Sequence, residues 1–186
     1  AVTLSGDVVQ TDRSLCKGCG VCVKICPNEA RTIIGRETTS GQVYKEIVSD
    51  KMFYQESSGG LTLSGGEVLF QVEFSRAILE LCKMDDIHTV IETSGYGSWE
   101  NIEQILEYTD LVLFDFKHFD DNDHKKLTGV SNKTILENIK KICHELRIPI
   151  IARLPIIPDC NDSLENINQA ASFISTELGK SIKVHL

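Results

Sequence analysis

The sequence contains 186 residues, of which 41% are hydrophobic and 25% are charged, enough for one sizeable core and a small appendage. Its formal net charge is −8 and its lysines and arginines are scattered among acidic residues, which argues against a nucleic-acid partner because such proteins need a basic face. No apolar run approaches the roughly 20 residues of a membrane span, and the first residues lack a secretory signal, so a cytoplasmic protein without a membrane partner is expected.

The first predicted elements are two short strands within residues 1–11. Apolar residues lie on both sides of the triplet Ser5-Gly6-Asp7, which has the composition of a turn. A cysteine-rich segment follows directly. We assign residues 1–36 to one module and residues 37–186, where the sequence pattern changes, to a second.

Four of the seven cysteines form the run Cys16, Cys19, Cys22 and Cys26, followed by Pro27. An odd total with one tight group favours a metal site in a reducing cytoplasm over disulfides. The spacing is that of bacterial ferredoxins, in which short gaps wrap thiolates around a 4Fe–4S cluster. Zinc sites usually pair two knuckles across a longer loop, so a zinc-stabilised binding module is the weaker interpretation.

The fourth cysteine of such a run ligates the other cluster in two-cluster ferredoxins. Cys16, Cys19 and Cys22 are therefore expected to share one cluster, and Cys26 to contribute to a second. No second run of four cysteines exists in the sequence. We expect the first module to be half of a two-cluster ferredoxin-like insertion, with its other half preceding the chain.

Strands and helices alternate through the second module, after a helix over residues 40–49. Strands that read as continuous apolar runs, separated by amphipathic helices, predict a parallel sheet covered by helices. This pattern fits an open doubly wound sheet or part of a (β/α) barrel, and periodicity does not choose between them. The predicted strands are 61–63, 89–91, 111–114, 148–151 and 181–186, and the helices between them are 72–82, 98–107, 131–146 and 163–178.

The first of these strands ends in Ser64, Gly65, Gly66 and Glu67. Two glycines at the carboxyl end of a parallel strand allow close backbone approach to a ligand, and a carboxylate there suits a cationic amine. The alternative is a tight turn with a solvated glutamate.

Charged residues also follow the next three strands. Glu92, then Asp115 and Lys117, then Arg153 are expected at the same edge of the sheet, where ligands of parallel α/β folds bind. Single acidic residues after strands are often helix caps, but four successive strand ends with charges are harder to explain in that way. The two cations could hold a carboxylate, and the two carboxylates could hold a cation or ribose hydroxyls.

Two histidines, His118 and His124, lie in the polar segment 117–126. A zinc site is conceivable there, but we interpret them as isolated surface side chains.

With these motifs the sequence resembles the glycyl-radical-enzyme activating enzymes of the pyruvate formate-lyase activating type, a branch of the radical S-adenosylmethionine superfamily with a ferredoxin-like insertion. The stretches that carry the resemblance are 12–31, 59–71, 92–96, 115–132 and 155–166. The resemblance implies a partial (β/α) barrel in which segment 64–67 holds the methionine amino group of S-adenosylmethionine. It also places Asp115, Lys117 and Arg153 at the cofactor, and Glu92, Thr93 and Asp115 near a monovalent cation.

The activity that the resemblance implies is that of an anaerobic oxidoreductase. A reduced 4Fe–4S cluster cleaves S-adenosylmethionine, and the resulting 5′-deoxyadenosyl radical removes a hydrogen atom from a glycine of the partner enzyme. An electron donor such as flavodoxin or ferredoxin is also implied. Val68 stands where the family often has proline.

The CxxxCxxC run that holds the catalytic cluster in this family is absent from the sequence. We therefore expect an internal fragment of a longer protein, truncated at both ends, without catalytic residues of its own and inactive alone. The alternative function is a non-catalytic iron–sulfur module for electron transfer or docking.

Overall fold

A computed structural model describes residues 1–186, which form two compact units, Ala1–Thr38 and Thr39–Leu186. The first unit has little secondary structure. Its elements are β1 (Val2–Ser5), β2 (Val8–Thr11) and α1 (Val21–Lys24). The two strands pair antiparallel, as the turn signal predicts, with Gly6 at φ +61° between them. Gly20 is the only buried residue of this unit, which therefore has no apolar core of its own.

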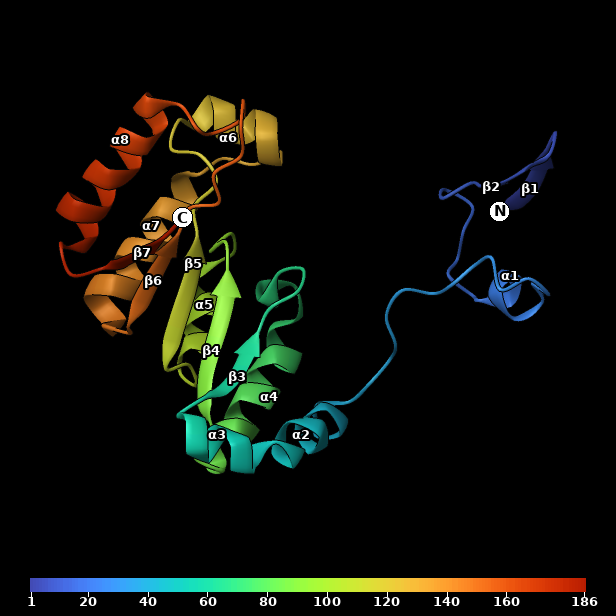
Figure 1. Ribbon diagram of the computed structural model, residues 1–186, viewed down its shortest axis with the longest axis horizontal. Coiled ribbons are helices and arrows are strands. Elements are labelled where there is room, and N and C mark those ends of the chain that lie inside the picture. Colours follow the sequence, from blue (N-terminus) through green and yellow to red (C-terminus); the bar gives the residue numbers. More distant parts are fainter. The chain divides into compact units, whose positions relative to one another are not determined.

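The second unit begins with two helices and then alternates strands with helices (Figure 1). The two opening helices are α2 (Ser40–Ser49) and α3 (Lys51–Ser57), and the latter was not predicted. The strands are β3 (Gly60–Leu63), β4 (His88–Thr93), β5 (Leu111–Asp115), β6 (Ile150–Arg153) and β7 (Lys183–His185). The helices are α4 (Val72–Met84), α5 (Trp99–Leu106), α6 (Asp121–Thr128), α7 (Lys133–Lys141) and α8 (Leu164–Phe173). Short helical turns η1 (Val68–Gln71), η2 (Ile142–Leu146) and η3 (Ile174–Leu178) extend α4, α7 and α8.

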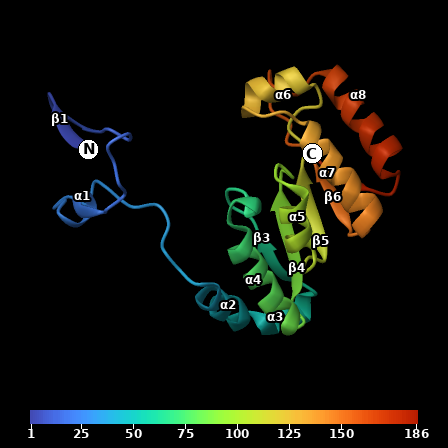
Figure 2. The same ribbon diagram turned by 180° about the vertical axis from the view of Figure 1, so that it is seen from behind.

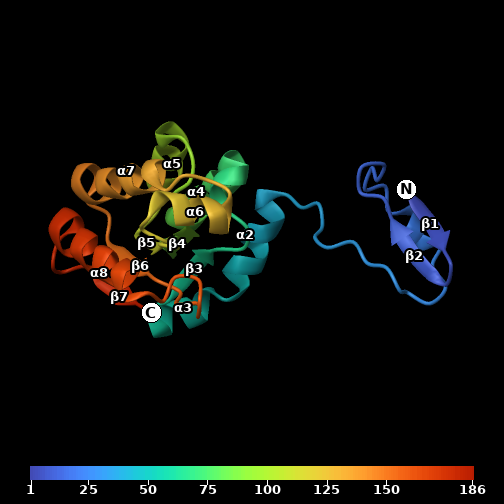
Figure 3. The same cartoon turned by 90° about the horizontal axis from the view of Figure 1, so that it is seen from above.

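All five strands of this unit are parallel and stand in sequence order, β3-β4-β5-β6-β7. A doubly wound sheet reverses its order at a switch point, whereas a (β/α) barrel adds each strand beside the one before it. The order therefore decides between the two predicted architectures in favour of a partial barrel. The helices α4, α5, α7 and α8 curve around the outer face of the sheet (Figures 2 and 3).

The main core lies between the sheet and these helices. Phe114 and Val112 on β5 are fully buried against Ile105 of α5 and Ile139 of α7. A smaller cluster around Ile78 and Cys82 joins α4 to α2. Both clusters form because apolar residues recur at three- and four-residue spacing along each helix, so that each helix buries one apolar stripe. No helix combines the length and apolarity that crossing a lipid bilayer requires.

Two details of local structure differ from what the sequence pattern predicted. The fourth strand spans Ile150–Arg153 and not 148–151, because Pro149 has no N–H for the ladder and only its carbonyl accepts, from the N–H of Val112. The polar segment 117–126 contains most of α6, a helix that was not predicted. Asp120 caps its first turn, because its side chain accepts from the N–H groups of Asn122 and Asp123.

Candidate functional site

A cavity of about 470 Å³ opens at the carboxyl ends of β3, β4 and β5. It lies where charged strand ends were predicted to meet. Its lining includes eight of the nine predicted cofactor-binding residues, namely Ser64, Gly65, Gly66, Glu67, Glu92, Thr93, Asp115 and Lys117. The ninth, Arg153, contacts two of them. The structure thus brings all nine together, and their role in binding remains a prediction.

Glu67 is held firmly by the loop that follows β4. One carboxylate oxygen accepts from Thr93 Oγ1 at 2.6 Å, and the other accepts from the backbone N–H and the hydroxyl of Ser94 at 2.9 and 2.7 Å. Glu67 also caps η1 through the N–H of Leu69 at 3.3 Å. The alternative of a freely solvated glutamate is therefore wrong for this residue.

The glycines beside Glu67 leave space in front of the sheet. Gly65 has φ +116°, a conformation that favours glycine, and a Cβ at either Gly65 or Gly66 would meet nothing within 4 Å. The strand end is thus a cradle of bare backbone that a ligand can approach closely.

A chain of charges crosses the mouth of the barrel from β3 to β6. Ser64 Oγ donates to Glu92 at 2.9 Å, and Arg153 pairs with the other oxygen of Glu92 at 2.7 Å. Lys117 Nζ lies 2.8 Å from Asp115 Oδ2, and Arg153 Nε lies 3.3 Å from Asp115 Oδ1. We call Ser64, Glu67, Glu92, Asp115, Lys117 and Arg153 the carboxyl-edge cluster.

The neighbours of Glu92 favour its charged form. The hydrogen bond from Arg153, and next that from Ser64, hold the pKa of Glu92 below its ordinary value. The same contact with Glu92 raises the pKa of Arg153. Asp115 Oδ1 is buried and has no hydrogen-bond partner, because Arg153 is near it without hydrogen-bond geometry. A buried acceptor without a partner is costly, so this oxygen fits a ligand group or a cation.

The four clustered cysteines are all free thiols in the first unit. Cys16, Cys19 and Cys22 line one cavity of about 610 Å³, and Cys26 does not. However, no three potential ligands anywhere in residues 1–186 are grouped closely enough to hold a metal ion. The thiols suit iron by their chemistry and spacing, and the cluster assignment remains a prediction.

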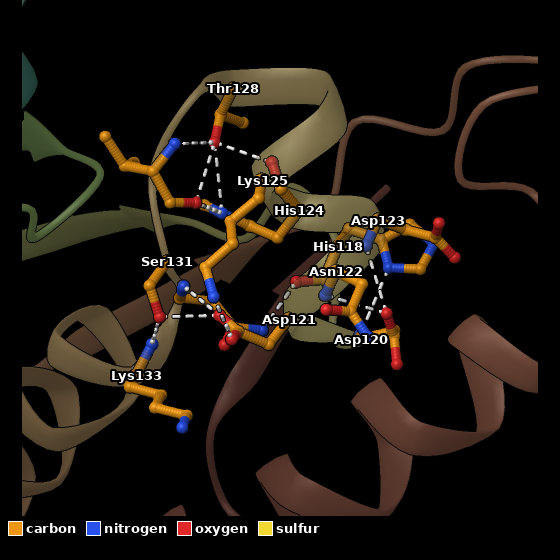
Figure 4. Close-up of polar contacts among 12 residues, drawn as sticks. His118, Asp120, Asp121, Asn122, Asp123, His124, Lys125, Thr128, Ser131 and Lys133 are labelled. Atoms are coloured by element: carbon orange, nitrogen blue, oxygen red, sulfur yellow. Dashed lines mark hydrogen bonds and ion pairs between the residues drawn. The ribbon is translucent and has the colours of Figure 1, made fainter.

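His124 was misassigned to the surface by sequence reasoning. It is only 3% exposed and lines the cavity at the strand ends. Its Nδ1 lies 2.7 Å from the carbonyl oxygen of Val130, which can only accept, so Nδ1 carries a proton (Figure 4). A helix with almost no apolar periodicity gave no signal that its histidine would be buried.

Asp121 closes the base of α6. It accepts from Ser131 Oγ at 2.5 Å and from the N–H of Asn132 at 3.1 Å, joining the two ends of the segment, and it pairs with Lys125 (Figure 4). The contacts with Lys125 and then with Ser131 lower the pKa of Asp121 to about 2. The α6 segment is therefore a closed wall on one side of the cavity.

Comparison with known proteins shows the family of the chain. Residues 16–171 match the radical SAM superfamily. The (2S)-3-sulfopropanediol dehydratase activating enzyme of Klebsiella oxytoca is 40% identical over 178 residues, covering 96% of this chain and 56% of the relative. The pyruvate formate-lyase-activating enzyme of Clostridium pasteurianum is 41% identical over 160 residues, covering 85% of this chain and 66% of the relative.

A solved structure points the same way. A domain of the pyruvate-formate lyase-activating enzyme from Bacteroides vulgatus is 31% identical, with a TM-score of 0.60 over 65% of this chain and 74% of that domain. The chain spans little more than half the length of the K. oxytoca relative.

Proposed function

The chain belongs to the radical SAM superfamily, in its branch of glycyl-radical-enzyme activating enzymes, and from this premise we propose that the whole protein generates a glycyl radical on a partner enzyme. It does so by reductive cleavage of S-adenosylmethionine. The observation that carries the proposal is the carboxyl-edge cluster, which gathers two cations and three carboxylates around one cavity. This arrangement complements the ammonium and carboxylate groups of a methionyl moiety.

Each end of the methionyl group has suitable partners. Lys117 and Arg153 are the cations available to its carboxylate, since both already pair with carboxylates at 2.7 to 2.8 Å. The segment 64–67 is assigned to its amino group, with the glycines leaving the backbone exposed and Glu67 fixed by Thr93 and Ser94. Binding would therefore exchange internal ion pairs for pairs with the ligand.

Glu92, Thr93 and Asp115 are assigned to a monovalent cation beside the methionyl carboxylate. The supporting observation is the buried Asp115 Oδ1, an oxygen that lacks a hydrogen-bond partner. Carboxylate and hydroxyl oxygens are the ligand types that hard cations prefer.

Radical SAM proteins use a 4Fe–4S cluster with S-adenosylmethionine. When bound, such a cluster would supply the electron with which S-adenosylmethionine is cleaved to methionine and a 5′-deoxyadenosyl radical. The radical takes a hydrogen atom from a glycine of the partner, which leaves 5′-deoxyadenosine and the glycyl radical. The residues of this chain contribute binding and orientation at the mouth of the barrel.

The first unit is assigned to electron supply. We assign residues 1–36, with Cys16, Cys19, Cys22 and Cys26, to half of a ferredoxin-like module, and residues 37–186 to the partial barrel. The external donor would be a flavodoxin or ferredoxin in the cytoplasm. Neither nucleic acid nor membrane has a place in this proposal.

The test uses the full-length protein, reconstituted with iron and sulfide without oxygen. With dithionite and S-adenosylmethionine it should release methionine and 5′-deoxyadenosine in equal amounts, and S-adenosylhomocysteine should yield neither product. Addition of the partner should then give the electron paramagnetic resonance signal of a glycyl radical. Bound iron without any 5′-deoxyadenosine would refute the proposal and favour the electron-transfer module instead.

A further inference from the structure

Three buried asparagine side chains hydrogen-bond to the backbone of the loop between β5 and α6. The carbonyl oxygens of Lys117, His118 and Phe119 each accept from an asparagine amide, and the N–H of Phe119 donates to an asparagine oxygen. Asn161 contacts Lys117 at 2.8 Å, Asn132 contacts His118 and Phe119 at 3.2 and 2.7 Å, and Asn166 accepts from Phe119 at 2.9 Å. Three consecutive residues are thereby fixed through their backbone.

The three asparagines come from distant parts of the chain and are all buried. Asn132 immediately precedes α7, Asn161 lies in the loop after β6, and Asn166 lies in the first turn of α8. They are 3%, 5% and 6% exposed. Asn166 Nδ2 also donates to the carbonyl oxygen of Asn161 at 2.8 Å, so two of them form one connected unit.

Asparagine suits this task for a chemical reason. Buried backbone N–H and C=O groups need partners, and a loop between a strand and a helix has none of the regular ones. The asparagine side chain is short and carries both a donor and an acceptor, so it can serve carbonyl and N–H groups alike. Asn161 does both, because its Nδ2 donates to Lys117 and Pro155 while its Oδ1 accepts from Ile157.

The loop carries one functional side chain, that of Lys117, into the cavity. This side chain has a flexible four-carbon stem and is 39% exposed, and its ammonium pairs with Asp115. The position of the ammonium depends on this ion pair and on where the backbone of residue 117 is fixed. Asn161 fixes that point directly.

We propose that Asn132, Asn161 and Asn166 are positioning residues that hold the Lys117 ammonium in place to receive the carboxylate of S-adenosylmethionine. This inference rests on the proposed function. The asparagines act through Lys117 and do not touch the ligand themselves.

A fourth buried asparagine supplies a matched control. Asn138 is 3% exposed and donates to the carbonyl oxygens of Gly95 and Gly97 at 2.9 and 3.1 Å, in the loop after β4. Its replacement by alanine also removes buried hydrogen bonds to two loop carbonyls, but none of them belongs to the Lys117 loop. A purely structural role would make Asn138 and Asn161 equivalent.

The experiment is a double-mutant cycle on the full-length reconstituted protein, with S-adenosylmethionine dissociation constants from equilibrium dialysis. Asn161→Ala should raise the dissociation constant about tenfold in the wild-type background and less than twofold in the Lys117→Ala background. Asn138→Ala should have the same effect in both backgrounds. An equal effect of Asn161→Ala in the two backgrounds overturns the proposal. If Asn161→Ala does not fold, Asn132→Ala replaces it with the same expected result.

A second measurement separates this inference from the proposed function. The rate at which acetic anhydride labels Lys117, followed by mass spectrometry without any ligand, should rise in Asn161→Ala relative to Asn138→Ala. If the wild-type protein binds no S-adenosylmethionine, the proposed function fails, and the labelling rates still decide the positioning role. Equal Lys117 labelling in the two variants overturns it.

Discussion

Replacement of Glu67 by alanine should destabilise the fold although this residue lies at a cavity mouth. Its carboxylate joins the loop after β3 to the loop after β4 by three hydrogen bonds of 2.6 to 2.9 Å to Thr93 and Ser94. A fourth bond, to Leu69, caps η1. Glu67→Ala removes all four and leaves their donors to water.

The size of the effect follows from the number and environment of these bonds. A hydrogen bond to a charged group contributes about 1.5–3 kcal/mol when it is well shielded. Glu67 is half-buried, so water replaces part of each bond, and about 0.7 kcal/mol for each of the three short bonds is a reasonable value. We therefore expect a loss of about 2 kcal/mol in the free energy of unfolding.

Urea unfolding followed by circular dichroism measures this loss, provided that the dependence on urea is unchanged. The matched control is Glu73→Ala, since Glu73 is exposed in the first turn of α4 and should change stability by less than about 0.5 kcal/mol. A Glu67→Ala variant as stable as the control would refute the reasoning that this carboxylate joins the two loops.

Two further predictions concern backbone strain and pH. Gly95→Ala should lower the free energy of unfolding by about 2–4 kcal/mol, because the residue has φ +71° and its Cβ would lie 2.4 Å from the buried Phe114 ring. The control Gly129→Ala, at φ +84° with open space around the Cβ, should lower it by only about 1 kcal/mol. Equal shifts of the melting temperature in the two variants would contradict this account. The contact with Lys125 lowers the pKa of Asp121 from 3.8 to about 2. The stabilisation of the fold by the Asp121 carboxylate is therefore complete above pH 3.8 and is lost as the pH falls through 2. In the Asp121→Asn variant, the urea midpoint of unfolding should therefore change less between pH 4 and pH 2 than in the wild-type protein. The same dependence of the midpoint on pH in both proteins would exclude this contribution.

The strands were predictable because each one is an apolar run between helices with a clear periodicity. Leu111 to Phe114 lie within β5, and Ser98 caps α5 as expected from its sequence. The charged strand ends were also predictable, since parallel strands bring their carboxyl ends to one edge. Apolar periodicity could not choose between a doubly wound sheet and a barrel, because only the pairing order of the strands decides that question; the resemblance implied the partial barrel, and the strand order confirms it.

Tertiary contacts determine the features that sequence reasoning missed. The helix α6 has no apolar stripe and depends on its Asp120 cap and on the contact between Asp121 and Ser131. The burial of His124 follows from that closure. The asparagine clamp on the Lys117 loop likewise has no local signature, because an isolated asparagine between elements usually indicates only a turn or a cap.

The central claim is that the carboxyl-edge cluster binds S-adenosylmethionine. The most direct test is equilibrium dialysis of radiolabelled S-adenosylmethionine with the full-length reconstituted protein and its Glu92→Gln variant. We predict saturable binding of one ligand per chain and a dissociation constant at least about tenfold higher in the variant, because a neutral amide cannot replace the carboxylate paired with Arg153. Absence of saturable binding, or equal affinity in both proteins, would contradict the account.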